Sequence, residues 1–349
     1  MRNQLKWGIG LLFVSAIFGV AQDEAQLIVV SKPPPPSVES DPPQGLLFAS
    51  PFDMASSSPY FDTAGAPESL EYIRFRAGNA YVTFDDGPDA DYPGGIMVIA
   101  DFATRQDGGF DPSQDRLITG ANAGLLEPKG IALAPERGVL IVADFAGAKL
   151  SIFPLAAEGN AEPAFVVTDL GTDVREEPRR PWGLSYDAAQ DRLFVGATDG
   201  VVLVFDEFLR TRPSAPTRTI IPTLDDERIS SNLHDLSYLP EQDILIVSDV
   251  GSATTADQNN FKSDGSVFTL ENVSAADGET EIGVYLAGEN TLLGNPVGLD
   301  FDGEALYVTE RTRDLVLRFD DFLNLENPDT APAAAVTVAQ PEDVSLAPE

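Results

Sequence analysis

The chain has 349 residues, a formal net charge of -34, and a hydrophobic content of 43%. This acidity argues against nucleic acid as a partner, because phosphate binding needs clustered basic residues. There are no cysteines, which excludes disulfides and thiolate metal sites. The 27 prolines and 29 glycines are typical of many short strands separated by turns, so we expect one large all-β domain.

Residues 1–21 have the features of a secretory signal peptide. Arg2 and Lys6 precede an apolar run, and Gly19 and Ala21 supply small residues before a cleavage point. The run is shorter than the roughly 20 residues that cross a bilayer, which favours cleavage over an uncleaved anchor. We therefore expect a secreted or periplasmic protein without integral membrane contact after cleavage.

Residues 22–44 are polar and rich in proline, with Pro33 to Pro36 in succession. This composition predicts an extended spacer, to which Leu27–Val30 could add an edge strand. Residues 45–349 then form the folded domain.

The folded domain is built from a repeat, of which Pro181–Phe205 is the clearest copy. Its opening, PWGLSY, returns as PESLEY at Pro67, PKGIAL at Pro128, LHDLSY at Leu233, PVGLDF at Pro296 and PEDVSL at Pro341. A second strand follows as AYVTF from Ala80, LIVAD from Leu140, LFVGA from Leu193, LIVSD from Leu245 and LYVTE from Leu306. Third strands begin near Ile96, Lys149, Val201, Ser266 and Leu315, and outer strands near Ala164, Thr217, Ile282 and Ala334. Four short strands per repeat, at a spacing close to the roughly 40 to 50 residues of a blade, predict a β-propeller.

The two ends of the domain complete one blade. Pro341–Glu349 stops after one strand, whereas Gly45–Asp62 supplies LLFAS, interpreted as a second strand, and PYFD without an opening of its own. Pairing the C-terminal strand with these N-terminal strands closes a six-bladed propeller without a free edge. Seven blades stay open if the spacer contributes more strands.

The openings at Pro128, Pro181 and Pro296, followed by L-(I/F/Y)-V, resemble NHL-repeat six-bladed propellers over residues 45–349. At this level the chain is also similar to propellers of the gluconolactonase, senescence-marker and paraoxonase types. Asp235 and Asp343 depart from this pattern, because they stand where the openings at Pro128, Pro181 and Pro296 have glycine. The resemblance implies the fold, while propellers host unrelated activities.

Two positions of the repeat surround one mouth of the central channel, because inner strands start and second strands end on the same face. After the opening residue stand Glu68, Lys129, Trp182, His234, Val297 and Glu342. At the end of the second strand stand Phe84, Asp144, Ala197, Asp249, Glu310 and Ser50. These charged and aromatic side chains predict a polar pocket, and the alternative is that they pair with one another around a water-filled channel.

Two kinds of chemistry are candidates at this mouth. His234, the sole histidine, is a candidate base beside Asp235, whose carboxylate would raise its pKa; the alternative is an oriented hydrogen-bond partner. A calcium ion is the other candidate, with the ligands Glu68, Asp144, Asp249, Glu310 and Glu342. The gluconolactonase resemblance implies a Glu, an Asn and an Asp around an axial calcium, but no asparagine follows an opening proline. The loop Asp85–Gly95, with Asp86, Asp89 and Asp91, is a second calcium candidate or an ordinary acidic loop.

Three loops are expected on the same face. Asp249–Asp264 is long enough to cover the mouth. Arginines occur in the other two loops, at Arg175, Arg179, Arg180, Arg311 and Arg313. With Lys129 these could hold an anionic ligand such as a sugar acid, and the alternative is local pairing with Glu176, Glu177 and Asp314.

These observations favour a secreted, monomeric propeller that binds a small-molecule or protein ligand at the mouth without catalysis. A calcium-dependent lactonase or related hydrolase is the alternative function, in which the ion would polarise a carbonyl or activate water. A structural protein of the cell envelope is the second alternative.

Overall fold

The structure is a computed structural model of the chain and describes residues 26–32, 46–63, 66–87, 89–90, 93–106, 108–252 and 264–347. The predicted signal peptide, Asp91 and most of the predicted covering loop Asp249–Asp264 lie outside the described residues. No helix in the described ranges is long and apolar enough to cross a membrane.

Three of the sheets have four antiparallel strands each. The first consists of β4 (Leu70–Arg76), β5 (Asn79–Phe84), β6 (Gly95–Ile99) and β8 (Arg116–Thr119). The second consists of β9 (Pro128–Ala134), β10 (Val139–Asp144), β11 (Lys149–Pro154) and β12 (Phe165–Val167). The third consists of β22 (Pro296–Phe301), β23 (Leu306–Glu310), β24 (Leu315–Phe319) and β25 (Ala334–Thr337).

The other two sheets are larger. A five-stranded sheet runs in the order β26 (Pro341–Leu346), β1 (Gln26–Ser31), β2 (Leu46–Pro51), β3 (Ser58–Asp62) and β7 (Gly108–Gly109). The nine-stranded sheet runs in the order β13 (Pro181–Asp187), β14 (Arg192–Ala197), β15 (Val202–Phe205), β16 (Arg218–Leu224), β21 (Gly278–Leu286), β20 (Ser266–Glu271), β19 (Ile244–Asp249) and β18 (Leu233–Leu239), with β17 (Glu227–Arg228) beside β16. It contains two antiparallel runs of four strands, whose outer strands β16 and β21 pair in parallel.

Short helices occupy some of the turns. They are α1 (Phe208–Thr211) and the 3-10 turns η1 (Phe102–Thr104), η2 (Pro135–Arg137), η4 (Glu289–Thr291), η5 (Arg311–Arg313) and η6 (Phe322–Asn324).

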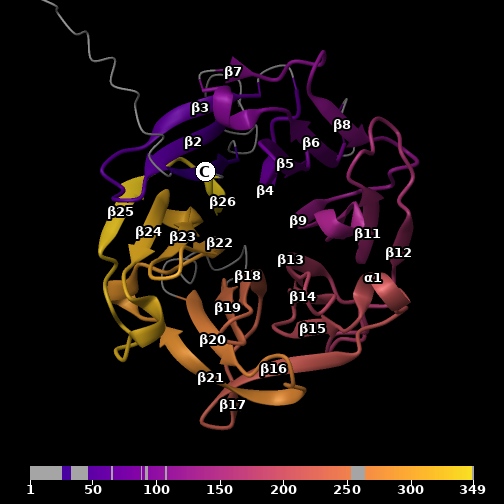
Figure 1. Cartoon of the computed structure of the whole chain (residues 1–349). Helices are drawn as coiled ribbons and strands as arrows, with labels where there is room; N and C mark the ends of the chain where they lie inside the picture. Colours follow the sequence, from indigo (N-terminus) through magenta and orange to yellow (C-terminus); the bar gives the residue numbers. More distant parts are fainter. Residues whose placement is uncertain are drawn as a thin grey trace, which may run out of the picture.

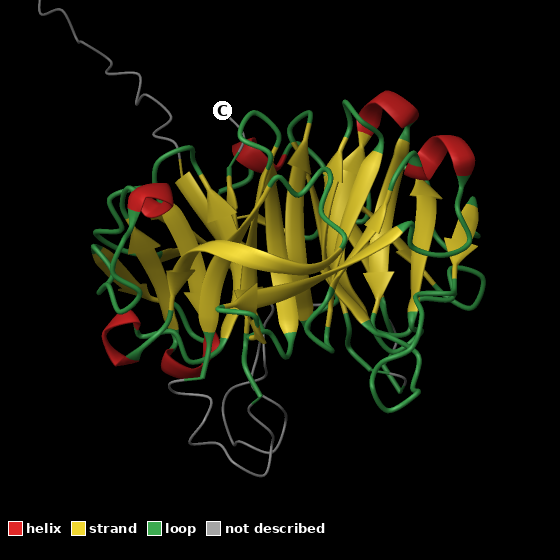
Figure 2. Cartoon of the chain, turned by 90° about the horizontal axis from the view of Figure 1, so that it is seen from below, coloured by secondary structure: helices red, strands yellow, loops and turns green. Residues whose placement is uncertain are grey.

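The innermost strands β4, β9, β13, β18, β22 and β26 each contact the next and close a ring around the central axis. Figure 1 shows the sheets arranged radially about this axis. In Figure 2 the strands cross the thickness of the disc and the loops gather on its two faces. The fold is all-β and propeller-like, as the repeats predict, and the predicted third and outer strands are present as β6, β11, β15, β20, β24, β12, β16, β21 and β25.

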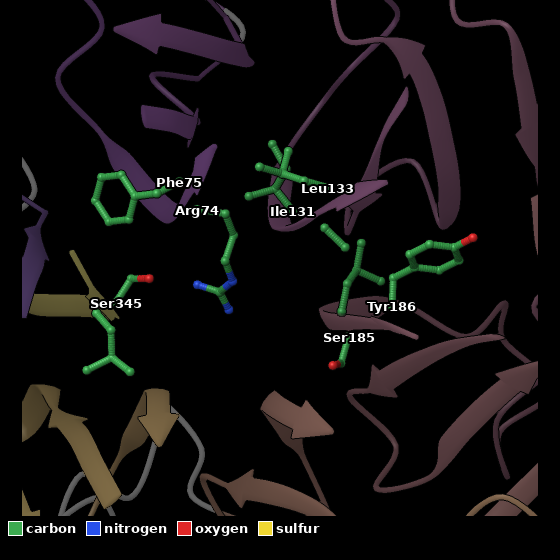
Figure 3. A pocket seen from close by; sticks show the side chains of 10 residues that line it. Arg74, Phe75, Ile131, Leu133, Ser185, Tyr186 and Ser345 are labelled. Atoms are coloured by element: carbon green, nitrogen blue, oxygen red, sulfur yellow. The ribbon is translucent and has the colours of Figure 1, made fainter. Parts of the chain in front are cut away.

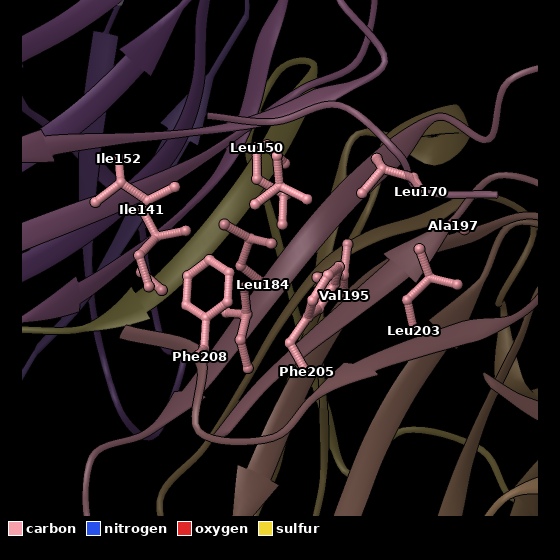
Figure 4. Close-up of a cluster of buried hydrophobic side chains, with 14 of the residues drawn as sticks. Ile141, Leu150, Ile152, Leu170, Leu184, Val195, Ala197, Leu203, Phe205 and Phe208 are labelled. Carbon is pink, nitrogen blue, oxygen red and sulfur yellow. The ribbon is translucent and has the colours of Figure 1, made fainter. Parts of the chain in front are cut away.

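The hydrophobic core lies between neighbouring sheets. In one cluster Ile141 of β10 faces Leu184 and Phe205 of the next sheet (Figure 4). Each sheet is covered on both faces, so a second strand contains a continuous apolar run such as Leu193–Val195 in place of an alternating pattern. Burial of each large apolar side chain contributes about 1.5–3 kcal/mol.

The chain ends meet in one sheet, as predicted, because β26 pairs with β1 and brings Val344 opposite Val29. The predicted strand order in this sheet is wrong. Leu46–Ser50 belongs to the third strand, and β1 lies between it and β26 as the second. Leu27–Val30 therefore form an interior strand, inside the range predicted as spacer. Their sequence LIVV matches the LIVA and LIVS of other second strands, but the prolines that follow suggested a spacer.

Candidate functional site

Each inner strand has a β-bulge near its first residue, where it has one residue more than the second strand beside it. Bulges commonly redirect a side chain next to a functional site. The residues at this position are Glu71, Lys129, Trp182, His234, Val297 and Glu342, which we call the mouth ring. Five of the six are buried, and Trp182 is partly exposed.

The repeat alignment predicts Glu68 in this ring, and that prediction is wrong. Leu70 of β4 pairs with Phe84, as the first residue of an inner strand pairs with the last residue of its second strand. Glu71 therefore occupies the ring position, and Glu68 precedes the strand. The sequence predicts an opening at Pro67 because the true opening, Leu-Glu-Tyr, lacks the usual proline and glycine.

Lys129 is the centre of a buried ion-pair network. Its Nζ lies 2.7 Å from Glu71 Oε1, 3.0 Å from Glu127 Oε1 and 3.8 Å from Asp85 Oδ2. Lys32 pairs with the same Glu71 carboxylate. Burial alone would raise the pKa of Glu71, but the two lysines lower it. Burial would likewise lower the pKa of Lys129, but the carboxylates raise it, so both partners are charged at neutral pH.

The aromatic members of the ring form a stacked row. The Trp182 and His234 rings are 3.9 Å apart with an interplanar angle of 15°. Lys129 Nζ lies 5.0 Å from the Trp182 ring centroid, and Phe145 meets Trp182 edge-on at 5.1 Å. Trp182 thus lies against both Lys129 and His234, so its fluorescence reports on changes in the mouth ring.

His234 does not have the raised pKa predicted from its neighbour Asp235. Burial, followed by the charges of Lys129 and Arg311, lowers the pKa of His234 to about 3. The Asp235 carboxylate bonds backbone N–H groups and faces Arg74. The imidazole is therefore neutral near pH 7, and its buried Nδ1 has no hydrogen-bond partner among the described residues. A base with so low a pKa is poorly matched to proton transfer near neutral pH.

Tyr72 closes the channel beneath the mouth ring. Its Oη lies 3.0 Å from the His234 carbonyl oxygen and 3.2 Å from that of Val297, on strands elsewhere in the ring. Close approach of the inner strands also requires glycine, since a Cβ at Gly183 would meet the backbone of His234.

Beyond Tyr72, Arg74 lies among buried carboxylates. Its Nη1 is 2.8 Å from Asp343 Oδ2, and its Nη2 is 3.5 Å from Asp235 Oδ1. Asp300 adds to the same negative field. Burial raises the pKa of Asp343 to about 8 and that of Asp235 to about 6, since one guanidinium serves three carboxyls. The two acids that replace the repeat's glycine thus serve as acceptors at the axis.

Asp343 implies that stability falls as the pH rises. An acid with a raised folded-state pKa keeps its proton while the unfolded chain has already lost it, so the free energy of unfolding decreases up to about pH 8 and then levels off. Between pH 6.5 and 8, His234, with an unperturbed pKa of 6.5, opposes this trend only near the lower limit, where part of the unfolded population is still protonated. Urea denaturation between pH 6.5 and 8 measures the slope, and Asp343→Asn should flatten it. An equal slope in that variant would contradict the assignment.

The acids that end second strands hold the loops that lead into the inner strands. Asp144 accepts backbone N–H groups of Leu126 and Glu127, Asp249 those of Ser231 and Asn232, and Glu310 those of Gly294 and Asn295. In the five-stranded sheet the second strand ends at Ser31, which pairs with Pro341. The predicted residue, Ser50, lies in the third strand. Each acid therefore holds the loop that leads into the inner strand of its own repeat.

This arrangement does not fit the predicted calcium ligand set. Asp144, Asp249 and Glu310 lie on separate strands, β10, β19 and β23, and each uses its oxygens for backbone donors. Asp86 of the second candidate loop likewise accepts the N–H groups of Glu68 and Ser69. Among the described residues no three acidic or histidine side chains form a group that could hold a metal ion. Calcium binding stays a prediction.

Several arginines of this face have local carboxylate partners. The pairs are Arg175 with Asp173, Arg179 with Asp199, and Arg311 with Glu342 of the mouth ring. Local pairing was one of the two expectations, although the partners differ from the acids that were expected. Burial raises the pKa of Glu342, and Arg311 opposes the shift. A sugar acid would have to displace these carboxylates.

No family model matches the chain, and no curated protein does. Among solved structures, a chain from the crystal structure of a nidogen/laminin complex aligns with a TM-score of 0.60 at 12% identity, over 92% of this chain and 98% of its own length. This chain folds as a β-propeller.

Two 6-phosphogluconolactonase-like proteins match similarly. The protein from Bacteroides fragilis has a TM-score of 0.57 at 11% identity, covering 94% of this chain and 99% of its own. The protein from Bacteroides uniformis has a TM-score of 0.55 at 12% identity, covering 93% and 100%. Identities this low show the shared propeller fold and leave function to the residues of the site.

Proposed function

We propose that this chain is a secreted or periplasmic, non-catalytic propeller with six NHL-like blades, which binds a polar ligand at the mouth ring. The blade number follows from counting the nine-stranded sheet as two blades, since it contains two inner strands, β13 and β18. The openings at Pro128, Pro181 and Pro296 support the NHL likeness, and the sequence of residues 1–21 supports export.

The observation that carries this proposal is the concentration of buried polar groups in the mouth ring. A buried ion pair such as Lys129 with Glu71 is often no more stabilising than apolar residues of similar volume. A buried polar atom without a partner, such as His234 Nδ1, costs about 1–3 kcal/mol. A ring needed only for stability would be better served by apolar side chains, so these groups favour binding.

The pairing of the ring charges indicates the chemistry of the ligand. Lys129 and Lys32 pair with Glu71, Glu127 and Asp85 in one network, and Arg311 pairs with Glu342. An ionic ligand would therefore break an existing pair, whereas hydroxyl or amide groups can add hydrogen bonds to both partners. We expect an uncharged hydrogen-bonding group, carried by a small molecule or by a loop of a protein partner.

Titration of Trp182 fluorescence tests this proposal, since the other tryptophan, Trp7, lies in the predicted signal peptide. Neutral hexoses and N-acetylhexosamines should give a saturable response, and the corresponding sugar acids should not. Glu71→Gln should weaken binding about tenfold or more, because a hydrogen bond to a charged group is worth about 1.5–3 kcal/mol. Glu177→Gln, on a neighbouring loop, is the control. A response to the sugar acids alone, or to none of the sugars, would overturn this ligand chemistry.

The calcium-dependent hydrolase calls for a separate measurement. Native mass spectrometry with and without a chelator reports whether the purified protein carries the ion. A bound calcium that the chelator removes, and that Asp249→Asn prevents from binding, would favour the hydrolase over the binding protein.

A further inference from the structure

A second cavity lies at the opposite end of the central axis from the mouth ring. It has a volume of about 400 Å³ and is lined by the later residues of β4, β9, β13 and β26. This volume falls within the range of roughly 300–1,000 Å³ that is typical of small-molecule sites. None of the mouth-ring residues lines this cavity, so it is distinct from the site of the proposed function.

Most of the residues that line this cavity are apolar or aromatic, but polar and apolar groups share its exposed surface. The apolar residues include Ile131 and Leu184, which are buried, and Phe75, Leu133 and Leu346, which are partly exposed. Figure 3 shows the side chains that β4, β9, β13 and β26 contribute to the cavity, with Tyr186 at the edge of the cavity. An aliphatic chain or ring placed here would lose contact with water on several sides.

The polar groups of the cavity are hydrogen-bond donors. Arg74 extends into it between Ser185 and Ser345 (Figure 3), and 23% of its side chain is exposed. It is the one charged residue in the lining. Ser185 Oγ accepts the backbone N–H of Tyr238 at 3.1 Å, so its hydroxyl hydrogen is left to donate. A ligand acceptor, such as a carbonyl oxygen, matches these donors.

The charges around Arg74 decide the charge of the ligand. Asp343, Asp235 and Asp300 lie behind the guanidinium and do not line the cavity. A carboxylate ligand would be attracted by one guanidinium and repelled by the ionised acids of this set, to which Asp343 adds its charge above about pH 8. A cationic ligand would meet the guanidinium first. An uncharged acceptor avoids both penalties and can still bond to Arg74.

We propose that this cavity binds an uncharged amphipathic molecule, with a carbonyl group at Arg74 and an aliphatic or cyclic body against Phe75, Leu133 and Leu346. The chemical class is that of amides, esters and lactones with a body of about six to ten carbons. The site is independent of the mouth ring, and either proposal can fail without the other.

Isothermal titration calorimetry with three probes of equal chain length tests this site. Octanamide should bind at least tenfold more tightly than octanoate or octylammonium. Hexanamide should bind about tenfold more weakly than octanamide, because it buries two methylene groups fewer. Leu133→Trp, which fills the cavity and leaves Arg74 in place, should weaken octanamide binding at least tenfold.

Two control variants complete the experiment. Leu126, which is 58% exposed and lies in the loop leading to the start of β9, gives the matched substitution Leu126→Trp, which should leave octanamide affinity unchanged. Glu71→Gln should also leave it unchanged, which separates this site from the mouth ring. The proposal is overturned if octanoate or octylammonium binds as tightly as octanamide, if Leu133→Trp has no effect, or if none of the probes binds.

Discussion

Truncation of the chain after Gln340 should destabilise the propeller by at least about 5 kcal/mol, which is comparable to the whole net stability of many domains. The truncation removes β26, so β1 loses its inner partner and the ring of inner strands opens. Arg74 and the Ile73 backbone lose the Asp343 carboxylate, and the buried Val344 is lost from its apolar cluster. Thermal and urea denaturation followed by circular dichroism would show a shifted or absent cooperative transition.

A pair of point variants separates loss of the inner strand from loss of chain length. Val344→Asp places an unpaired charge at a fully buried position and should cost about 4 kcal/mol or more. Val166→Asp makes the same change in the outer strand β12, where the valine is 45% exposed, and should alter stability by less than about 1 kcal/mol. Equal melting temperatures for the truncated and full-length chains would show that β26 does not close the ring.

The strands were predictable because the physics that selects them is local. A strand between two other sheets needs apolar side chains on both faces, which gives runs such as Leu193–Val195, and tight turns must follow it. Repetition of this pattern fixed the register wherever the opening keeps its proline and glycine, as at Pro128 and Pro181. Positions in the mouth ring such as Lys129 and Trp182 followed from that register.

The predicted register is wrong where contacts with distant strands, and not the local sequence, determine the residue at an inner-strand position. The repeat that opens at Leu70 has Tyr72 in the place of glycine, because its side chain fills the axis and bonds to carbonyls of other inner strands. The sequence around Leu70 has no signal for these distant partners. The repeat was therefore predicted to start at Pro67, which assigned Glu68 to the mouth ring in place of Glu71. In the five-stranded sheet the prolines that follow β1 likewise led to the prediction of a spacer in place of an interior strand.

The role of the acidic residues could be predicted from the sequence only in part. Many carboxylates bind neighbouring groups in the turns, as Asp191 accepts from the Tyr186 hydroxyl and Asp243 from that of Tyr238. These tyrosine and aspartate residues recur at the same spacing, a signal that was available in the sequence. The low pKa of His234 was not available, since it results from burial and from charges on other strands.

Substitution of one partner of the mouth-ring ion pair should have a larger effect than substitution of both. Glu71→Leu leaves Lys129 buried without its nearest carboxylate, and should cost about 3 kcal/mol, at the lower end of the effect of breaking a buried pair, because Glu127 and Asp85 stay near its charge. The double variant with Lys129→Met has no buried ammonium, and the charges that lose a partner in it, those of Lys32, Asp85 and Glu127, are partly exposed. Its free energy of unfolding should lie within about 1 kcal/mol of the wild type, because apolar replacement of buried pairs is often neutral or stabilising.

The double variant also distinguishes a ring retained for binding from one retained for stability. If the pair serves the ligand, the variant is as stable as the wild type in urea denaturation, and its Trp182 fluorescence no longer responds to the neutral sugars. If the pair serves the fold, the double variant loses about as much stability as Glu71→Leu, since the network with Lys32 and Glu127 is disrupted in both. A thermodynamic cycle over the wild type, the two single variants and the double variant gives the coupling energy of the pair directly. A large coupling energy with a near-neutral double variant is the combination that a binding site requires, because the charges then stabilise each other without stabilising the propeller.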